Sequence, residues 1–408
     1  MTHPRTALVI GGGIAGPVTA LALRKAGISA TVHEAYDSPA DGIGGYLSIA
    51  PNGLHALGVL GAGDVVPAIG TPMRSMIVRS WTGKRLAEFG GGPGEPPVGQ
   101  LVWRPDLYRA LHDEAARVGI RTEFGRRLVG AEETPDGVTA HFADGSTATA
   151  DLLIGADGIR STVRSLIDAA APGPRYTGLV SFGGKVADTG LPSTDGAMHM
   201  VFGRRAFFGY LVEADGSAGW FVNLPRKVPM TLAEARAVPA GEWLRELRAV
   251  FAADRVPAAD LIGRTNPAEL LIVGPMEDIP TVPTWSRGRM VLVGDSAHAT
   301  SPSSGQGASL AVESAVQLAR CLRDLPVDRA FAAYEGLRRA RVERIIALAA
   351  RTNSNKAAGP VARVFRDLLM PAMMRLMARP GRMDWQFGYE IDWDAPVPDP
   401  ADRALAGA

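Results

Sequence analysis

The feature that most constrains the fold is a glycine-rich turn near the N-terminus, set between an apolar strand and a helix. Residues 7–10 are an apolar run, and the turn Gly11-x-Gly13-x-x-Gly16 follows directly. Apolar residues at helical spacing come next, and a second short strand leads to Glu34. A strand, a glycine turn, a helix and a second strand form a βαβ unit, which predicts a Rossmann-like α/β domain.

Each residue of this turn has a separate physical role. Gly11 makes the tight turn, Gly13 lets the backbone approach a pyrophosphate, and Gly16 permits close packing of helix on strand. The Glu34 carboxylate can accept a hydrogen bond from a ribose hydroxyl and disfavours a 2′-phosphate, so FAD or NAD is preferred to NADP here. The same stretch adds Ala15 and Ala35 to the candidate contacts.

A second strand and glycine turn occupies residues 151–164. The turn Gly155-Ala-Asp157-Gly158 is followed by a helix that begins at a serine, and Asp157 is expected to face the nucleotide cleft. The alternative is a capped turn with two solvated arginines, Arg160 and Arg164.

The third element is the run near residue 290. An apolar strand, 290–293, ends in Gly294-Asp295, and a proline- and glycine-rich loop then opens a helix near Gly307. Asp295 can accept hydrogen bonds from sugar-like hydroxyls, and free N–H groups at the helix start suit an anion such as a reduced flavin ring. Alternatively, Asp295 only caps a helix or makes an Asx turn. The candidate contacts in the loop are Pro302, Gly305, Gln306, Gly307 and Ala308.

Composition excludes several other functions. The length of 408 residues predicts two to three domains. The 43 Lys and Arg nearly balance the 42 Asp and Glu, so no strong electrostatic field would attract nucleic acid or an anionic membrane. One cysteine, Cys321, excludes an internal disulfide, and seven histidines lack metal-ligand spacing, so no metal site is expected. No signal peptide or membrane span is recognisable, which predicts a cytoplasmic protein.

The three elements, in this order and spacing, resemble the single-component FAD-dependent aromatic hydroxylases, which are flavoprotein monooxygenases related to p-hydroxybenzoate and salicylate hydroxylases. The resemblance covers about residues 5–340. It implies a discontinuous Rossmann-like FAD-binding domain, an interleaved β-sheet substrate domain and a C-terminal helical arm. The predicted limits are 1–70, 101–175 and 281–330 for the first, 71–100 and 176–280 for the second, and 331–408 for the third.

The resemblance also implies the chemistry. FAD, bound non-covalently, is reduced by NADH or NADPH, O2 adds to the reduced ring, and a C4a-hydroperoxyflavin hydroxylates an aromatic or polycyclic small molecule of catabolism or antibiotic biosynthesis. By motif, Glu34 meets the adenosine ribose, Arg104 the FAD backbone, and Gly294-Asp295 the ribityl chain. Asp157-Gly158 matches a motif that contacts both FAD and the nicotinamide co-substrate. Arg160 and Arg164 are candidates to bind the phosphates of that co-substrate.

Two stretches depart from the family pattern. The family has Asn after the second loop glycine and an acidic residue further along the helix, where Ser309 and Ser314 stand here. The segment 42–45 is rich in glycine, ends at Gly45 and precedes Tyr46. It leaves room for flavin movement, although simple loop flexibility explains it equally well.

Substrate contacts are expected on an aromatic stretch of the sheet domain. The candidates are Met200, Phe202, Phe208, Tyr210, Trp220 and Phe221, together with Pro302. Alternation along strands implies that about half of them face elsewhere. Tyr210 and His298 are the candidate catalytic side chains; the alternatives are a packing role for Tyr210 and burial under the loop for His298.

Other functions on the same fold stay open at this stage. They include Baeyer–Villiger insertion, N-oxidation and halogenation, although the Trp-x-Trp-x-x-Pro run of halogenases does not occur in the sequence. A non-catalytic FAD-binding scaffold is the alternative from another class. The predicted partners are the small-molecule substrate and O2, without nucleic acid or membrane, and the chain is expected to be a monomer or a homodimer.

Overall fold

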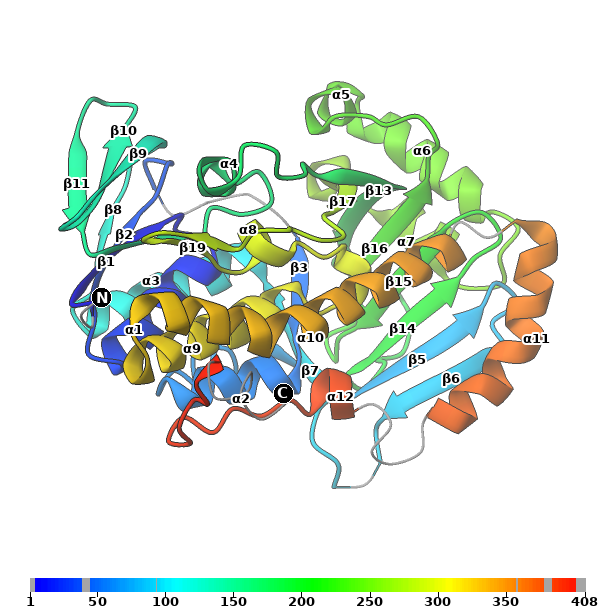
Figure 1. The fold of residues 1–408 in the computed structure, drawn as a ribbon. Coiled ribbons are helices and arrows are strands. Elements are labelled where there is room, and N and C mark those ends of the chain that lie inside the picture. Colours follow the sequence, from blue (N-terminus) through cyan, green and yellow to red (C-terminus); the bar gives the residue numbers. More distant parts are fainter. Residues whose placement is uncertain (1–3, 39–44, 93, 357–358, 378–383, 401–408) are drawn as a thin grey trace.

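A computed structural model describes residues 4–38, 45–92, 94–356, 359–377 and 384–400. Two sheets lie side by side in an elongated molecule, and one long helix, α10 (Val327–Lys356), runs from the first to the second (Figure 1). The fold class predicted from the sequence is confirmed: a parallel α/β unit is joined to a sheet-based unit and a helical C-terminal region.

The first sheet has six strands, in the order β18-β19-β12-β1-β2-β8, and every pairing except β18–β19 is parallel. Its central strands are apolar and almost wholly buried because helices and loops cover both faces. The bounds are β1 Thr6–Ile10, β2 Ser29–His33, β8 Arg121–Glu123, β12 Leu152–Gly155, β18 Ser286–Arg287 and β19 Met290–Leu292.

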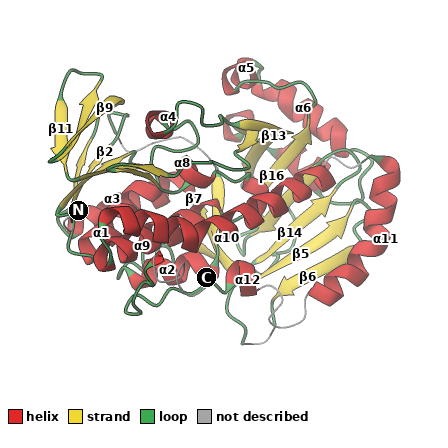
Figure 2. Cartoon of the chain, in the orientation of Figure 1, coloured by secondary structure: helices red, strands yellow, loops and turns green. Residues whose placement is uncertain are grey.

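The predicted βαβ opening is present. The helix that joins β1 to β2 is α1, Ala15–Lys25. Gly27 follows its C-cap with φ +82°, the left-handed conformation that glycine adopts most easily. Helices α1, α9 and α10 lie together against this sheet (Figures 1 and 2). The other helices of this unit are α2 Pro51–Val59, α3 Arg104–Arg117, α4 Thr162–Ile167, α8 Asp295–His298 and α9 Gly307–Asp324.

The second large sheet has seven strands, in the order β17-β13-β16-β15-β14-β5-β6. Helices α5, α6 and α7 cover one of its faces, and α11 packs at the β6 edge (Figure 1). The strands are β5 Ser75–Ser80, β6 Arg85–Gly90, β13 Arg175–Val186, β14 Ala197–Phe202, β15 Phe207–Val212, β16 Ala218–Pro225 and β17 Leu271–Asp278. The helices are α5 Leu232–Ala237, α6 Ala240–Phe251, α7 Ala258–Arg264 and α11 Pro360–Met377.

The helical segment of residues 232–251 is divided into two helices at Pro239. Proline cannot donate the backbone hydrogen bond that a continuous helix requires, so α6 starts afresh after it.

Two small three-stranded sheets complete the fold. The first, β11-β10-β9, extends from the parallel sheet, and the second, β3-β7-β4, lies between the two large sheets (Figure 1). Residues 71–100 therefore divide, since β5 and β6 join the seven-stranded sheet while β4 and β7 pair with β3. The predicted domain limits stay a prediction. The strands are β3 Tyr46–Ile49, β4 Thr71–Met73, β7 Gly99–Trp103, β9 Leu128–Thr134, β10 Gly137–Phe142 and β11 Thr147–Ala150.

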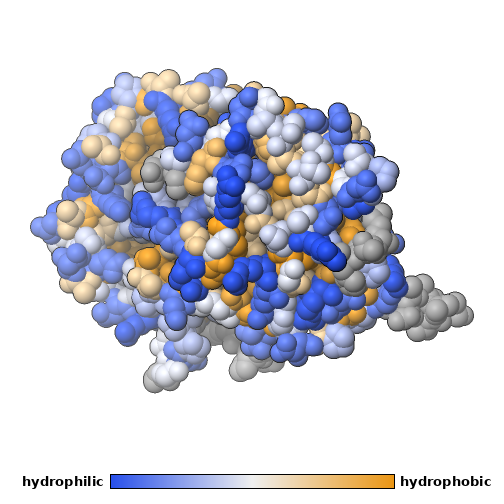
Figure 3. Space-filling view, turned by 90° about the vertical axis from the view of Figure 1, so that its left-hand side faces the viewer, coloured by the Kyte–Doolittle hydropathy of each residue, from blue (hydrophilic) through white to orange (hydrophobic). Residues whose placement is uncertain are grey.

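Hydrophilic and hydrophobic residues are interspersed on the face shown in Figure 3. Within the described ranges, no helix is long and apolar enough to cross a membrane.

Candidate functional site

The N-terminal glycine turn has the geometry of a phosphate-binding turn. Gly11 has φ +101°, and a Cβ there would lie 2.5 Å from the carbonyl oxygen of Ala156. A Cβ on Gly16 would collide with the carbonyl oxygen of Gly11. At Gly13 the nearest atom to such a Cβ is the Tyr108 hydroxyl, 3.9 Å away, so space remains above the turn. No side chain caps α1, and its first N–H groups are available to an anion.

Glu34 closes one side of this turn. Its carboxylate accepts hydrogen bonds from the backbone N–H groups of Gly12, at 2.5 Å, and Tyr36, at 2.9 Å. These bonds hold the glycine turn beside the end of β2. Glu34 and its neighbour Ala35 are both partly exposed, so the carboxylate retains acceptor capacity for a ribose hydroxyl.

Arg104, Tyr108 and Asp295 meet at the carboxyl end of the parallel sheet. The Arg104 Nε donates to the Tyr108 hydroxyl at 2.7 Å, and the Arg104 backbone N–H donates to the carbonyl oxygen of Gly45 at 3.2 Å. Desolvation raises the pKa of Asp295, and the nearby Arg104 opposes that shift. Asp295 is nonetheless exposed, so its carboxylate is accessible although protein surrounds it closely enough to desolvate it.

The loop that follows Asp295 lies on the same side of the sheet. Gly294 has φ +66°, and a Cβ there would lie 2.9 Å from the Ala15 Cβ, so strand end and α1 pack closely. In the loop, Gly305 is left-handed at φ +61°, and Pro302 is exposed. No side chain caps α9, which leaves its first N–H groups, including those of the partly exposed Gly307 and Ala308, facing outward.

A buried polar network anchors α9 below this loop. Glu313 pairs with Arg338 at 2.6 Å and with Arg341 at 2.8 Å, and it accepts from Asn52 at 2.5 Å. The side chains of Glu313 and Arg338 have no solvent exposure. Asn52 also donates to the Gln306 side chain at 2.9 Å, so the network extends to the loop.

Ser309 and Ser314, the departures from the family pattern, have structural roles. The Ser309 hydroxyl accepts from the Ala50 N–H at 3.0 Å, and a Cβ on Gly53 would lie 2.6 Å from that hydroxyl. Ser314 accepts from the Arg338 Nε at 3.1 Å. The family pattern has an acidic residue where Ser314 stands here, and in this chain the neighbouring Glu313 supplies a buried carboxylate. The clue was available, since a glutamate in an otherwise apolar helix requires a partner.

The Asp157 turn acts as a helix cap, which was the alternative interpretation. Its carboxylate accepts from the Ser161 hydroxyl at 2.5 Å and from the N–H groups of Thr162 and Val163 at 2.7 and 3.1 Å. The turn remains at the cleft, because the Asp157 Cα lies 2.8 Å from the position of a Cβ on Gly11. Gly158, at φ +78°, completes it.

The two arginines of this motif differ in accessibility. Arg164 is buried and donates to the carbonyl oxygens of Ser296 and Ile159, at 3.1 and 2.6 Å. The expectation that it is solvated or binds a phosphate is therefore wrong, because its guanidinium joins α4 to α8 inside the protein. Arg160 is 65% exposed and forms a bidentate ion pair with Glu277.

The aromatic candidates divide between the two faces of the seven-stranded sheet. Phe208, Tyr210 and Trp220 pack in the core beneath α6 and α7. Their predicted role as substrate contacts is wrong, because strand alternation turns them away from the open face. The remaining candidates, Met200, Phe202 and Phe221, lie on the opposite face, and Phe202 packs there against Met370 of α11.

The candidate catalytic side chains are both buried. Burial raises the pKa of Tyr210, which makes its hydroxyl harder to deprotonate. His298 accepts from or donates to the Ser314 hydroxyl at 2.8 Å, and desolvation lowers its pKa to about 3. Burial under the loop, the alternative to a catalytic role, is the observed position of His298.

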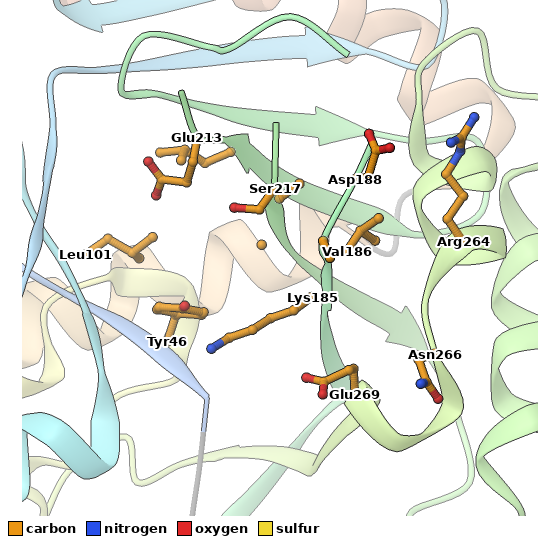
Figure 4. A pocket seen from close by; sticks show the side chains of 14 residues that line it. Tyr46, Leu101, Lys185, Val186, Asp188, Glu213, Ser217, Arg264, Asn266 and Glu269 are labelled. Carbon is orange, nitrogen blue, oxygen red and sulfur yellow. The ribbon is translucent and has the colours of Figure 1, made fainter. Parts of the chain in front are cut away.

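A cavity of about 570 Å³ opens at one end of the uncovered sheet face. Figure 4 shows the Lys185 side chain extending toward Tyr46. Its ammonium lies 5.2 Å from the centre of the Tyr46 ring and 4.7 Å from that of Trp103. The other lining residues named in Figure 4 are Leu101, Val186, Asp188, Glu213, Ser217, Arg264, Asn266 and Glu269.

Known proteins share this architecture and much of the sequence. The family model described as an FAD binding domain matches residues 5–236 and 277–349. The chain is 34% identical over 348 residues to the FAD-dependent urate hydroxylase of Klebsiella pneumoniae, covering 83% of this chain and 87% of the relative. It is 34% identical over 424 residues to the 3-amino-4-hydroxybenzoate 2-monooxygenase PtmB3 of Streptomyces platensis, covering 97% and 99%.

A solved structure agrees with these matches. HpxO of Klebsiella pneumoniae, in complex with FAD and uric acid, superposes with a TM-score of 0.81 at 28% identity, covering 93% of this chain and 96% of that one. The groups present fit FAD: the space at Gly13 and the free N–H groups of α1 suit a pyrophosphate, and Asp295 and the uncapped start of α9 offer an acceptor and donors for the rest of the cofactor. The chain therefore belongs to the family of the FAD binding domain and is an FAD-dependent enzyme of the aromatic hydroxylase type.

Proposed function

We propose that this enzyme uses NADH or NADPH and O2 to hydroxylate an aromatic or polycyclic small molecule. The observation that carries the proposal is the grouping of Arg104, Tyr108 and Asp295 at the carboxyl end of the parallel sheet, which supports a site for the flavin half of FAD. The uncapped start of α9 adds free N–H groups. Hydroxylases for urate and for 3-amino-4-hydroxybenzoate, both aromatic compounds, are among its relatives.

When bound, FAD supplies the redox chemistry that carries electrons from the nicotinamide to O2 and an oxygen atom to the substrate. The protein's own residues bind the cofactor and orient it. The N–H groups of α1 receive the pyrophosphate, and Asp295 accepts from the ribityl hydroxyls. The free N–H groups at the start of α9 would favour negative charge on a bound flavin through the helix dipole.

The nicotinamide co-substrate has no glycine fingerprint of its own in the sequence. Of the two arginines considered for its phosphates, Arg160 remains as a candidate because its guanidinium is exposed. Its ion pair with Glu277 would have to open for a phosphate to bind, which makes Arg160 a site of transient binding. We retain monomer or homodimer as the expected assembly.

The proposal is tested with the purified protein in three steps. FAD is released by denaturation and quantified, NAD(P)H oxidation is followed with and without a panel of aromatic compounds, and products formed under ¹⁸O₂ are analysed by mass spectrometry. We expect FAD retention, oxidation that a substrate stimulates, and one labelled oxygen atom in the product. Protein that takes up no added FAD, or product without label, would contradict the proposal.

A further inference from the structure

The last residue of α10, Lys356, places an ammonium group against the seven-stranded sheet. The Nζ donates to the Asn223 side-chain oxygen at 2.7 Å and to the Ser303 hydroxyl at 2.8 Å. It also lies 4.1 Å from the centre of the Phe207 ring. Three separate parts of the fold thus meet at one cation: the sheet, the loop that precedes α9, and the end of α10.

This cation has no counter-charge. No carboxylate in the described part of the chain forms an ion pair with Lys356, and its contacts are an amide, a hydroxyl and an aromatic ring. Desolvation alone lowers the pKa of Lys356 to about 7. Lys356 is only partly exposed, and an ammonium without a counter-charge is costly to desolvate even in part, so the site favours an anion that would restore its charged form.

Lys356 stands at the edge of the sheet face that α5, α6 and α7 leave uncovered. Strand register orders this face in rows. The first row lines the cavity and consists of Lys185, Gly219 and Leu211. The second row consists of Gly183, Phe221 and Gly209. The third row lies under Lys356 and consists of Ser181, Asn223 and Phe207. The first and third rows are four residues apart along β13, roughly 13 Å.

The middle row makes a flat apolar floor. Gly183 and Gly209 have no side chains, and the Phe221 ring lies across Gly209, where a Cβ would collide with it. A planar aromatic compound that extends from the cavity along this row would have its far end at Lys356. On the side of Lys356 it also approaches the loop of residues 302–307.

We propose that Lys356 recognises an acidic group of the substrate, so that the enzyme takes aromatic compounds bearing a carboxylate or a comparable anion. The inference rests on the proposed function and specifies its substrate class. The ammonium donates to the anion directly. Ser303, which accepts from Lys356, is free to donate its own proton to a second oxygen of the anion. Charge-assisted hydrogen bonds of this kind contribute more than neutral ones.

The test uses the FAD-loaded enzyme and a panel of hydroxybenzoates, each paired with its hydroxybenzamide. Kd is obtained from the change in flavin absorbance on titration at about pH 6.5, where a benzoate is ionised and Lys356 is charged. The variants are Lys356→Met, Lys356→Arg and, as a control on the same sheet unit, Lys227→Met, whose residue is exposed. Thermal unfolding of each variant is measured in parallel.

We expect at least one acid to bind the wild-type enzyme about tenfold or more tightly than its amide. Lys356→Met should abolish that preference, Lys356→Arg should keep most of it, and Lys227→Met should leave it unchanged. A merely structural Lys356 would weaken acid and amide alike. Equal affinities in the wild type, a preference that survives in Lys356→Met, or no acid that binds would overturn the proposal.

Failure of the proposed function gives a different result. If neutral compounds stimulate NAD(P)H oxidation as well as acids do, the hydroxylase function stands and the role of Lys356 is refuted. If acids bind with a preference that depends on Lys356 but none becomes hydroxylated, the anion site stands and the proposed reaction is refuted.

Discussion

Replacing Glu313 by glutamine should destabilise the protein far more than replacing a matched surface glutamate. Glu313 and Arg338 have no exposed side-chain area, and Glu313 holds Arg341 as well. Burial raises the pKa of the Glu313 carboxyl, and the two arginines more than offset that effect, so its pKa is lowered overall. Glu313→Gln keeps the shape and leaves Arg338 as a buried cation without a counter-charge. Breaking a buried pair in this way costs about 3–5 kcal/mol of unfolding free energy.

The control is Glu335→Gln. Glu335 pairs with Arg339 at 2.8 Å within α10, but the two side chains are 33% and 25% exposed. Solvent screens that pair, and Arg339 keeps Glu343 as a second partner at 3.0 Å, so the expected loss is about 0–1 kcal/mol.

The assay is urea unfolding followed by far-UV circular dichroism, at one fixed FAD concentration because ligand binding itself stabilises the folded state. A third variant carries Arg338→Met in the Glu313→Gln background. It removes the orphaned cation and should recover part of the lost free energy. The reasoning is refuted if Glu313→Gln lies within about 1 kcal/mol of the wild type, or if Glu335→Gln is equally damaging.

Three further predictions concern the site. Asp295→Ala should lower FAD retention by about tenfold or more, as the loss of hydrogen bonds to a charged acceptor implies; unchanged flavin content after gel filtration would contradict the ribityl assignment. His298 stays neutral in the folded protein while its unfolded form takes up a proton below pH about 6.5, so stability is lost as pH falls toward the folded pKa of about 3. At pH 5 the loss is about 2 kcal/mol, and denaturation of His298→Gln at pH 7 and pH 5 should show a correspondingly smaller difference. Tyr210→Phe should leave kcat within about twofold, because the hydroxyl lies in the core beneath the helices; a loss of a hundredfold would restore Tyr210 as a catalytic candidate.

The local elements of the cofactor site could be predicted from the sequence. A glycine turn between strand and helix has one favourable geometry, and Gly11 and Gly16 leave no room for a side chain in it. The end of a parallel strand likewise has a fixed position in such a sheet, so the sequence alone places Asp295 at the carboxyl end of the sheet, where the cofactor is proposed to bind. These predictions succeed because the interactions are local or follow from the regular geometry of the sheet.

Only the tertiary structure decided which side chains face one another. Alternation predicts two faces for each strand of the seven-stranded sheet, but not that α6 and α7 would cover the one carrying Tyr210 and Trp220. The partners of Glu313 come from α2 and α10, and the contacts of Lys356 come from β16 and a distant loop. A buried charge is visible in the sequence only as an ionisable residue in an apolar helix or at a helix end. Its partner, or its lack of one, depends on how far-separated segments pack.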